Sequence, residues 1–134
     1  MSKREILFRG KRVDNGKWVE GDLSHYVLVG ETHICRMEDN LFTTIHKIDQ
    51  ETICRYTGYK DDTGKRIFEG DVVCFEDMES TESGYSEKSC CGKVGYDERE
   101  ACFYVTDRLS AESWEVLGEC HIIGNIFDNP ELLN

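Results

Sequence analysis

The chain has 134 residues, enough for one domain or two small lobes, and folding at this length buries roughly two-thirds of the unfolded surface. Its net charge is −11, and a field of that sign repels phosphate backbones, which argues against direct nucleic-acid binding. The apolar runs are too short to cross a bilayer, and the charged first residues lack the apolar stretch of a signal peptide. We therefore expect a cytoplasmic protein with no membrane partner.

The seven cysteines predict reduced thiols, because the chain shows no secretory signal and an odd number cannot be fully paired. Adjacent Cys90 and Cys91 are expected on opposite faces of a strand. Structural zinc sites use close-spaced Cys pairs, and no Cys-x-x-Cys occurs here. We expect no metal and no cofactor. A zinc site near Cys90, Cys91 and the acidic residues before them remains as the alternative.

Short runs rich in β-branched and aromatic residues follow one another between Gly, Asn and Asp, and helical periodicity is almost absent. In chain order, these runs predict strands over residues 6–9, 18–20, 23–29, 32–37, 52–57, 67–75, 92–96, 102–106 and 120–127. Asn15-Gly16 between the first two is a strong hairpin signal. Many short strands at this spacing predict an all-β fold with a barrel-like or multi-sheet architecture.

Two segments depart from this pattern. Residues 76–89 are polar and acidic without periodicity, so we expect a mobile surface loop there. Near the end, Asn129 precedes Pro130 and Glu131, which are typical of the start of a helix. We expect one short helical turn at the C-terminus.

An internal repeat at an offset of 48 residues links two parts of the chain. Gly10, Asp14, Gly16 and Lys17 recur as Gly58, Asp62, Gly64 and Lys65, and Glu20-Gly21-Asp22 recurs, one residue later, as Glu69-Gly70-Asp71. The repeat predicts two related hairpins, one in an N-terminal β lobe (1–49) and one in a C-terminal barrel-like lobe (50–134). The two lobes could also form one continuous domain. Glycines 16 and 64 suit hairpin turns, and glycines 21 and 70 suggest bulges or bends.

No sequence motif nominates a catalytic residue. The chain has neither a Gly-x-Ser-x-Gly elbow nor a phosphate-binding glycine loop, so we do not expect an enzyme. Candidate binding residues are Arg9, Trp18, Asp22 and Asp71. The two aspartates occupy matching positions of the repeat and could work as paired carboxylates, or they could cap local bends. Arg9 and Trp18 could form a stacking platform, although alternation favours Trp18 in a core with the cations on the solvated side.

Three segments of the chain carry a family resemblance: residues 4–12 (REILFRGKR) with 18–23 (WVEGDL), residues 56–73 (YTGYKDDTGKRIFEGDVV) and residues 123–133 (IGNIFDNPELL). They resemble the YopX family of bacteriophage and prophage proteins. The resemblance implies a phage or prophage origin in a bacterial host, an all-β fold of barrel-like character and homo-oligomeric assembly. It implies no biochemical activity.

Three functional hypotheses remain open. The first is a non-enzymatic phage accessory protein that acts through protein–protein contacts and self-association, with residues 76–89 binding a host protein. The second is an acidic decoy that occupies the basic groove of a host nucleic-acid-binding protein. The third is a small-ligand-binding or hydrolytic module that uses the repeated Glu-Gly-Asp segments.

Overall fold

The computed structural model of the chain describes residues 6–26, 30–38, 41–99, 101–105 and 119–133. Within these residues every strand pairing is antiparallel, which confirms the all-β prediction. No helix among them is long and apolar enough to cross a membrane. The elements are β1 (Phe8–Lys11), β2 (Trp18–Tyr26), β3 (Glu31–Glu38), β4 (Leu41–Lys47), the 3-10 turn η1 (Gln50–Thr52), β5 (Cys54–Lys60), β6 (Arg66–Phe68), β7 (Asp71–Thr81), β8 (Gly84–Asp97), β9 (Cys102–Val105), β10 (His121–Asn125) and the 3-10 turn η2 (Pro130–Leu133).

The chain forms two compact units, Met1–Gly58 and Tyr59–Asn134, and the division falls within β5. Each unit contains one copy of the predicted hairpin turn. In the first, Gly16 has φ +70° and its N–H donates to the Arg12 carbonyl at 2.9 Å. In the second, Gly64 has φ +87° and its N–H donates to the Asp61 carbonyl at 3.0 Å. Both glycines adopt the left-handed conformation that these turns require, as the repeat predicted.

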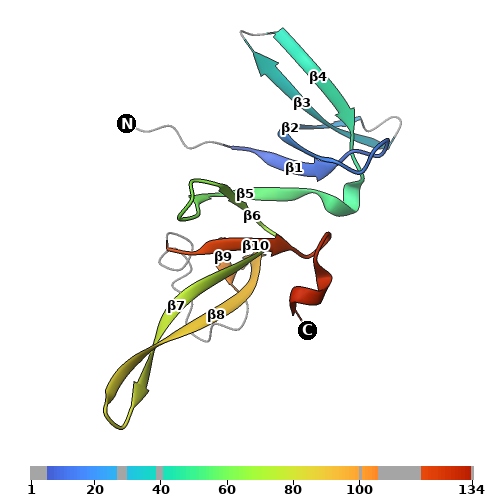
Figure 1. The fold of residues 1–134 in the computed structure, drawn as a ribbon. Coiled ribbons are helices and arrows are strands. Elements are labelled where there is room, and N and C mark those ends of the chain that lie inside the picture. The colour runs from blue at the N-terminus through green and yellow to red at the C-terminus, as the bar shows by residue number, and fades with distance from the viewer. Residues whose placement is uncertain (1–5, 27–29, 39–40, 100, 106–118, 134) are drawn as a thin grey trace. The chain divides into compact units, whose positions relative to one another are not determined.

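The sheet of the first unit curls back on itself. Its strands follow the order β4-β3-β2-β1-β5, and β1 also meets the segment that follows β4 (Figure 1). Arg12 and Ile48 form an antiparallel bridge, with the Val13 N–H donating to the Lys47 carbonyl at 3.0 Å and the Asp49 N–H donating to the Lys11 carbonyl at 2.9 Å. These bonds join β1 to the segment after β4 and partly close the sheet of this unit, although the barrel-like lobe had been predicted for residues 50–134.

Small residues permit this tight curl. A Cβ atom on Gly10 would overlap the side chain of Ile48, and one on Gly21 would overlap the Cys35 backbone carbonyl. Gly21 lies within the continuous strand β2, where the pairing of β2 passes from β1 to β3. The glycine is used there because two strands approach closely, and no positive φ is involved.

The second unit contains a sheet of order β10-β7-β8-β9. Its core gathers side chains from strands β6 to β9 and from the residue before β10: Ile67, Val73, Phe75, Val94, Val105 and Cys120. The expected continuous strand 67–75 is wrong, because Glu69 and Gly70 form a turn between β6 and β7. The C-terminal helical turn is confirmed as η2.

Residues 76–89 form a regular hairpin, so the prediction of a loop is wrong. Strands β7 and β8 pair from Val72↔Lys93 to Thr81↔Gly84 around a turn at Glu82 and Ser83. We call residues 76–89 the arm, and Figure 1 shows it extending well beyond the neighbouring strands of its sheet. Charge and polarity obscured the strands, but every arm residue except the turn residues Glu82 and Ser83 has a cross-strand partner. The ladder continues outward from the buried part of the sheet.

Candidate functional site

The two aspartates of the repeat have different surroundings. Asp71 is only 2% exposed, and its Oδ2 accepts a hydrogen bond of 2.8 Å from the Phe68 N–H. Together with Gly70, whose φ is +88°, it closes the turn between β6 and β7. Asp22 is exposed in the middle of β2, opposite Cys35. The bend-capping role considered for these residues therefore fits Asp71 and does not fit Asp22.

Arg9 and Trp18 lie together in the first unit. The Arg9 Cζ lies 4.6 Å from the centre of the Trp18 ring, and the Lys11 Nζ lies 5.3 Å from it, both within cation–π range. Arg9 is 8% exposed, so this cation is not on the solvated side as alternation suggested. A buried guanidinium held against an indole ring is a rigid arrangement, because the planar group is already oriented.

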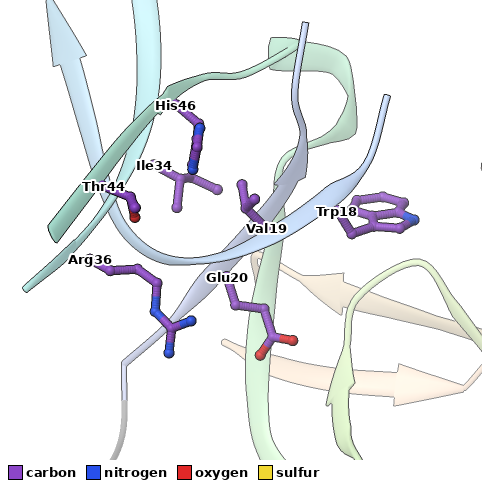
Figure 2. A pocket seen from close by; sticks show the side chains of 7 residues that line it. All are labelled: Trp18, Val19, Glu20, Ile34, Arg36, Thr44 and His46. Carbon is purple, nitrogen blue, oxygen red and sulfur yellow. The ribbon is translucent and has the colours of Figure 1, made fainter. Parts of the chain in front are cut away.

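A groove of about 460 Å³ opens beside this pair (Figure 2). It is lined by residues of β2, β3 and β4: Trp18, Val19, Glu20, Ile34, Arg36, Thr44 and His46. Ile34 is almost fully buried, while the longer polar side chains of Arg36 and Glu20 extend away from His46 (Figure 2). Sequence reasoning nominated Trp18 as a binding residue but none of the other residues that line the groove, because β4 was not predicted and the groove needs three paired strands.

The net charge lies almost wholly in one unit. The first unit has nine Lys and Arg against nine Asp and Glu, a net charge of zero, and the second has seven against eighteen, a net charge of −11. The arm holds five acids and one cation: Glu76, Asp77, Glu79, Glu82, Glu87 and Lys88. A negative field is thus concentrated on the second unit, and the arm carries five of its eighteen acidic residues.

Asp61, Asp62 and His121 form a cluster whose possible ligand atoms lie within 4.8 Å of one another. Burial raises the pKa of Asp61, but hydrogen bonds from the Thr63 hydroxyl and from the N–H groups of Lys65, Ile122 and Thr63 outweigh it and lower the pKa to about 2. Both Asp61 oxygens are therefore engaged in holding the hairpin turn against β10. Asp62 Oδ1 lies 3.0 Å from His121 Nδ1. The arrangement accounts for these carboxylates as structural groups.

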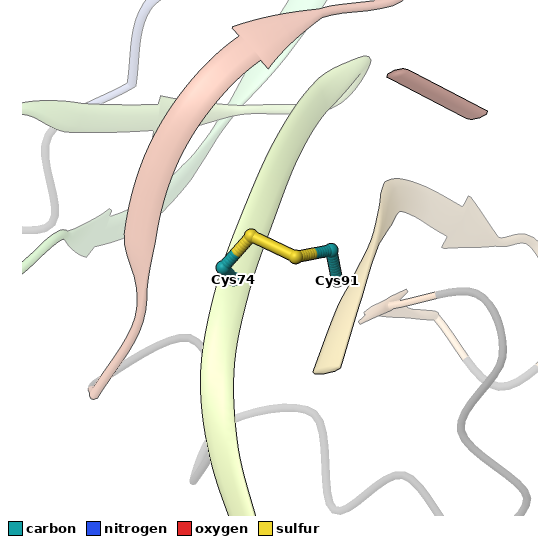
Figure 3. The surroundings of a disulfide bond; sticks show 2 residues. All are labelled: Cys74 and Cys91. Atoms are coloured by element: carbon teal, nitrogen blue, oxygen red, sulfur yellow. A yellow bond between two sulfur atoms is a disulfide. The ribbon is translucent and has the colours of Figure 1, made fainter. Parts of the chain in front are cut away.

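Cys74 and Cys91 form a disulfide across β7 and β8 (Figure 3). The prediction that all seven thiols are reduced is therefore wrong for this pair. The two residues are direct cross-strand partners with a Cα–Cα distance of 4.1 Å, which brings their sulfurs together. A hairpin centred on Glu82 and Ser83 would have revealed this pairing in the sequence, but the arm had been interpreted as a loop.

The other cysteines of this sheet have separate roles. Cys90 packs against the core while Cys91 is exposed, so the expectation that they face opposite ways is confirmed. Burial, with the nearby charges of Asp61 and Asp62, raises the pKa of the Cys120 thiol to about 11. Cys120 therefore stays protonated near neutral pH and behaves as a small apolar core residue.

Comparison with known proteins identifies the chain at the level of the family. The crystal structure of protein EF1440 from Enterococcus faecalis matches with a TM-score of 0.56 over 98% of this chain and 100% of that chain, at 20% identity, which shows a shared fold. No curated protein matches the chain. The family model described as YopX protein matches residues 7–134, nearly the whole chain. The chain therefore belongs to the YopX family.

Proposed function

We propose that the protein acts by binding another protein, and that the acidic arm of its second unit makes the contact. The observation that carries this proposal is the arm itself, a regular hairpin of fourteen residues with five acids against one cation. A paired hairpin fixes the backbone positions of its residues relative to one another, which a flexible loop of the same composition does not. Fixed spacing favours binding, because less conformational freedom is lost when the partner docks.

The strand edges of the arm support the same proposal. Among the described residues, β10 pairs with β7 only as far as Cys74, and β9 pairs with β8 only from Val94 onward. Beyond those points each arm strand has a described partner on one side only. A strand edge of this kind can accept an extended segment of another chain, and the acidic residues of the arm would favour a basic segment.

A partner with a basic surface follows from the charge. Opposite charge would speed the encounter at low ionic strength and make binding sensitive to salt. The phage or prophage setting that the family resemblance implies makes a bacterial host protein the proposed partner. A host nucleic-acid-binding protein, whose basic groove the arm would occupy as a decoy, is the more specific form of the same proposal.

Self-association is proposed through the first unit, where β4 is the terminal strand of the described sheet. Ile45 on this strand is 50% exposed, which leaves an apolar side chain beside a strand edge. An Ile45→Lys variant should shift the protein toward smaller assemblies, as measured by size exclusion with light scattering. An unchanged mass, or a wild-type protein that is already a monomer, would contradict self-association at this edge.

The hydrolytic alternative draws no support from the geometry. It needs two carboxylates free to exchange protons, whereas the Asp71 carboxylate is buried and accepts a backbone hydrogen bond. The repeated Glu-Gly-Asp segment is better explained as a structural element.

Deletion of the arm tests the proposed function. Residues 77–88 are replaced by Asn-Gly, which favours a two-residue hairpin turn and leaves the disulfide in place. The shortened protein should keep a cooperative thermal transition but lose the proteins that the full chain captures from nuclease-treated bacterial lysate at low salt. Loss of folding, or undiminished capture, would count against the arm as the binding element.

A further inference from the structure

The disulfide lies at the base of the arm. His121↔Cys74 is the last pairing of β10 with β7 in the direction of the arm, and Cys74 pairs on its other side with Cys91. The loop that the bond closes, with a sequence separation of 17 residues, contains the whole arm. The next pair outward, Phe75↔Cys90, packs against the core. Two adjacent cross-strand pairs therefore hold the base of the arm: the disulfide joins Cys74 and Cys91, and the core packs against Phe75 and Cys90.

The two cysteine residues differ in their exposure to solvent. Cys91 is exposed, Cys74 is half-buried, and the bond lies on the side of the sheet away from the core that contains Cys90. Thiol–disulfide exchange requires a thiolate to approach one sulfur along the bond, so exposure of Cys91 selects it as the sulfur attacked. Exposed disulfides are more readily reduced than shielded ones, and Cys91 is exposed.

We propose that the Cys74–Cys91 bond is a thiol–disulfide exchange site that fastens the arm when oxidised and loosens it when reduced by a dithiol. A thiolate of the dithiol attacks Cys91 Sγ, the bond between the two protein sulfurs breaks, and Cys74 leaves with the electron pair. The second thiolate of the dithiol then attacks the dithiol sulfur that is bonded to Cys91. This releases Cys91 as a thiolate. The dithiol becomes a cyclic disulfide, and the protein gains two electrons and two protons.

Reduction removes the disulfide but leaves the core packing at the base of the arm, so the sheet stays folded. The core on the opposite face, with Val73, Phe75 and Val94, does not involve the bond. The arm, whose described strands pair only with each other beyond this row, would then open more often by local unfolding. The consequence for partner binding rests on the proposed function, whereas the exchange site and the loosening do not.

The test uses the full chain without any binding partner. Amide hydrogen exchange, followed by mass spectrometry, is measured on the oxidised protein and on protein treated with dithiothreitol, and alkylation counts the free thiols. A Cys74→Ser/Cys91→Ser double variant represents the opened bond. Cys102→Ser is the matched control, because Cys102 is an exposed thiol in the same sheet that is not in the disulfide.

We expect dithiothreitol to release two further thiols without denaturant, and arm amides to exchange on the order of 10–100-fold faster once the loop is no longer closed. The double variant should exchange its arm amides at the fast rate with or without dithiothreitol, and Cys102→Ser should follow the wild type. Equal arm exchange in oxidised and reduced protein would overturn the proposal. Release of the thiols only in denaturant would overturn it as well.

Discussion

The two copies of the repeat contain the same Glu-Gly-Asp residues and fold differently. In the first, Gly21 lies in a continuous strand against the Cys35 carbonyl, and Asp22 is exposed. In the second, Gly70 has a positive φ in a turn, and Asp71 is buried where its carboxylate accepts the Phe68 N–H. One glycine is needed because it has no side chain, and the other because of its backbone conformation. A repeated motif therefore does not establish a repeated function.

The largest expected effect is at the first glycine. Gly21→Ala places a Cβ against a backbone carbonyl, which cannot move as the end of a side chain can, so we expect a loss of about 3 kcal/mol in the free energy of unfolding. Chemical denaturation measures it. Gly21→Asn should be at least as damaging, because the conflict is with bulk. A stable Gly21→Ala protein would show that the strands do not approach so closely.

The second-largest expected effect is a difference in stability between variants of Asp71 and Asp22. Asp71→Ala leaves a buried backbone N–H without its acceptor and should cost roughly 1.5–3 kcal/mol, whereas Asp22→Ala should change stability by less than about 0.5 kcal/mol. Thermal and denaturant unfolding of the two single variants gives the comparison directly. Equal losses at both positions would mean that the copies play the same structural role, contrary to the account given above.

Asp61 adds a dependence on pH to the second unit. Its pKa is lowered from 3.8 to about 2 in the folded protein, so its contribution to stability is complete above about pH 4 and is lost as the pH falls toward 2. The shift corresponds to roughly 2 kcal/mol. Asp61→Asn should lower stability at pH 6 and reduce the difference between pH 6 and pH 2. An unchanged pH profile would show that the carboxylate is not held as described.

The smallest expected effect distinguishes Gly70 from Gly21, because Asn should restore part of the stability lost on substitution only at position 70. Gly70→Ala should cost about 1–2 kcal/mol, because an L-residue is strained at positive φ. Gly70→Asn should recover part of that loss, since Asn tolerates this conformation better than Ala. Denaturation midpoints of both variants, compared with the Gly21 pair, measure the rescue. If Asn were no better than Ala at position 70, positive φ would not be the reason for the glycine.

Features set by local sequence were predictable. The turns at Gly16 and Gly64 and the C-terminal turn at Pro130 depend on a few adjacent residues, and all three are confirmed. Features set by pairing were not. Strand β4 contains adjacent threonines and no clear alternation, and its pairing with β3 creates the groove wall.

The candidate site shows the same limit. Arg9 and Trp18 were nominated from composition and lie together, but Glu20, Arg36 and His46 beside them were not predicted. The disulfide also depends on register, which acidic residues in the arm obscured. Local propensity predicts turns well because it acts over a few residues, whereas strand partners are selected by the whole sheet.

The central claim, that the charge of the arm selects a partner, is tested most directly with two matched triple variants. Glu76→Gln, Glu82→Gln and Glu87→Gln remove three charges from the arm, and Glu98→Gln, Glu119→Gln and Glu131→Gln remove three from exposed positions outside it. Quantitative mass spectrometry of proteins captured from bacterial lysate at low salt compares them. We expect the arm variant to lose its partners and the control variant to keep them. Equal loss in both would show that only net charge matters, and equal retention would exclude the acidic arm as the contact.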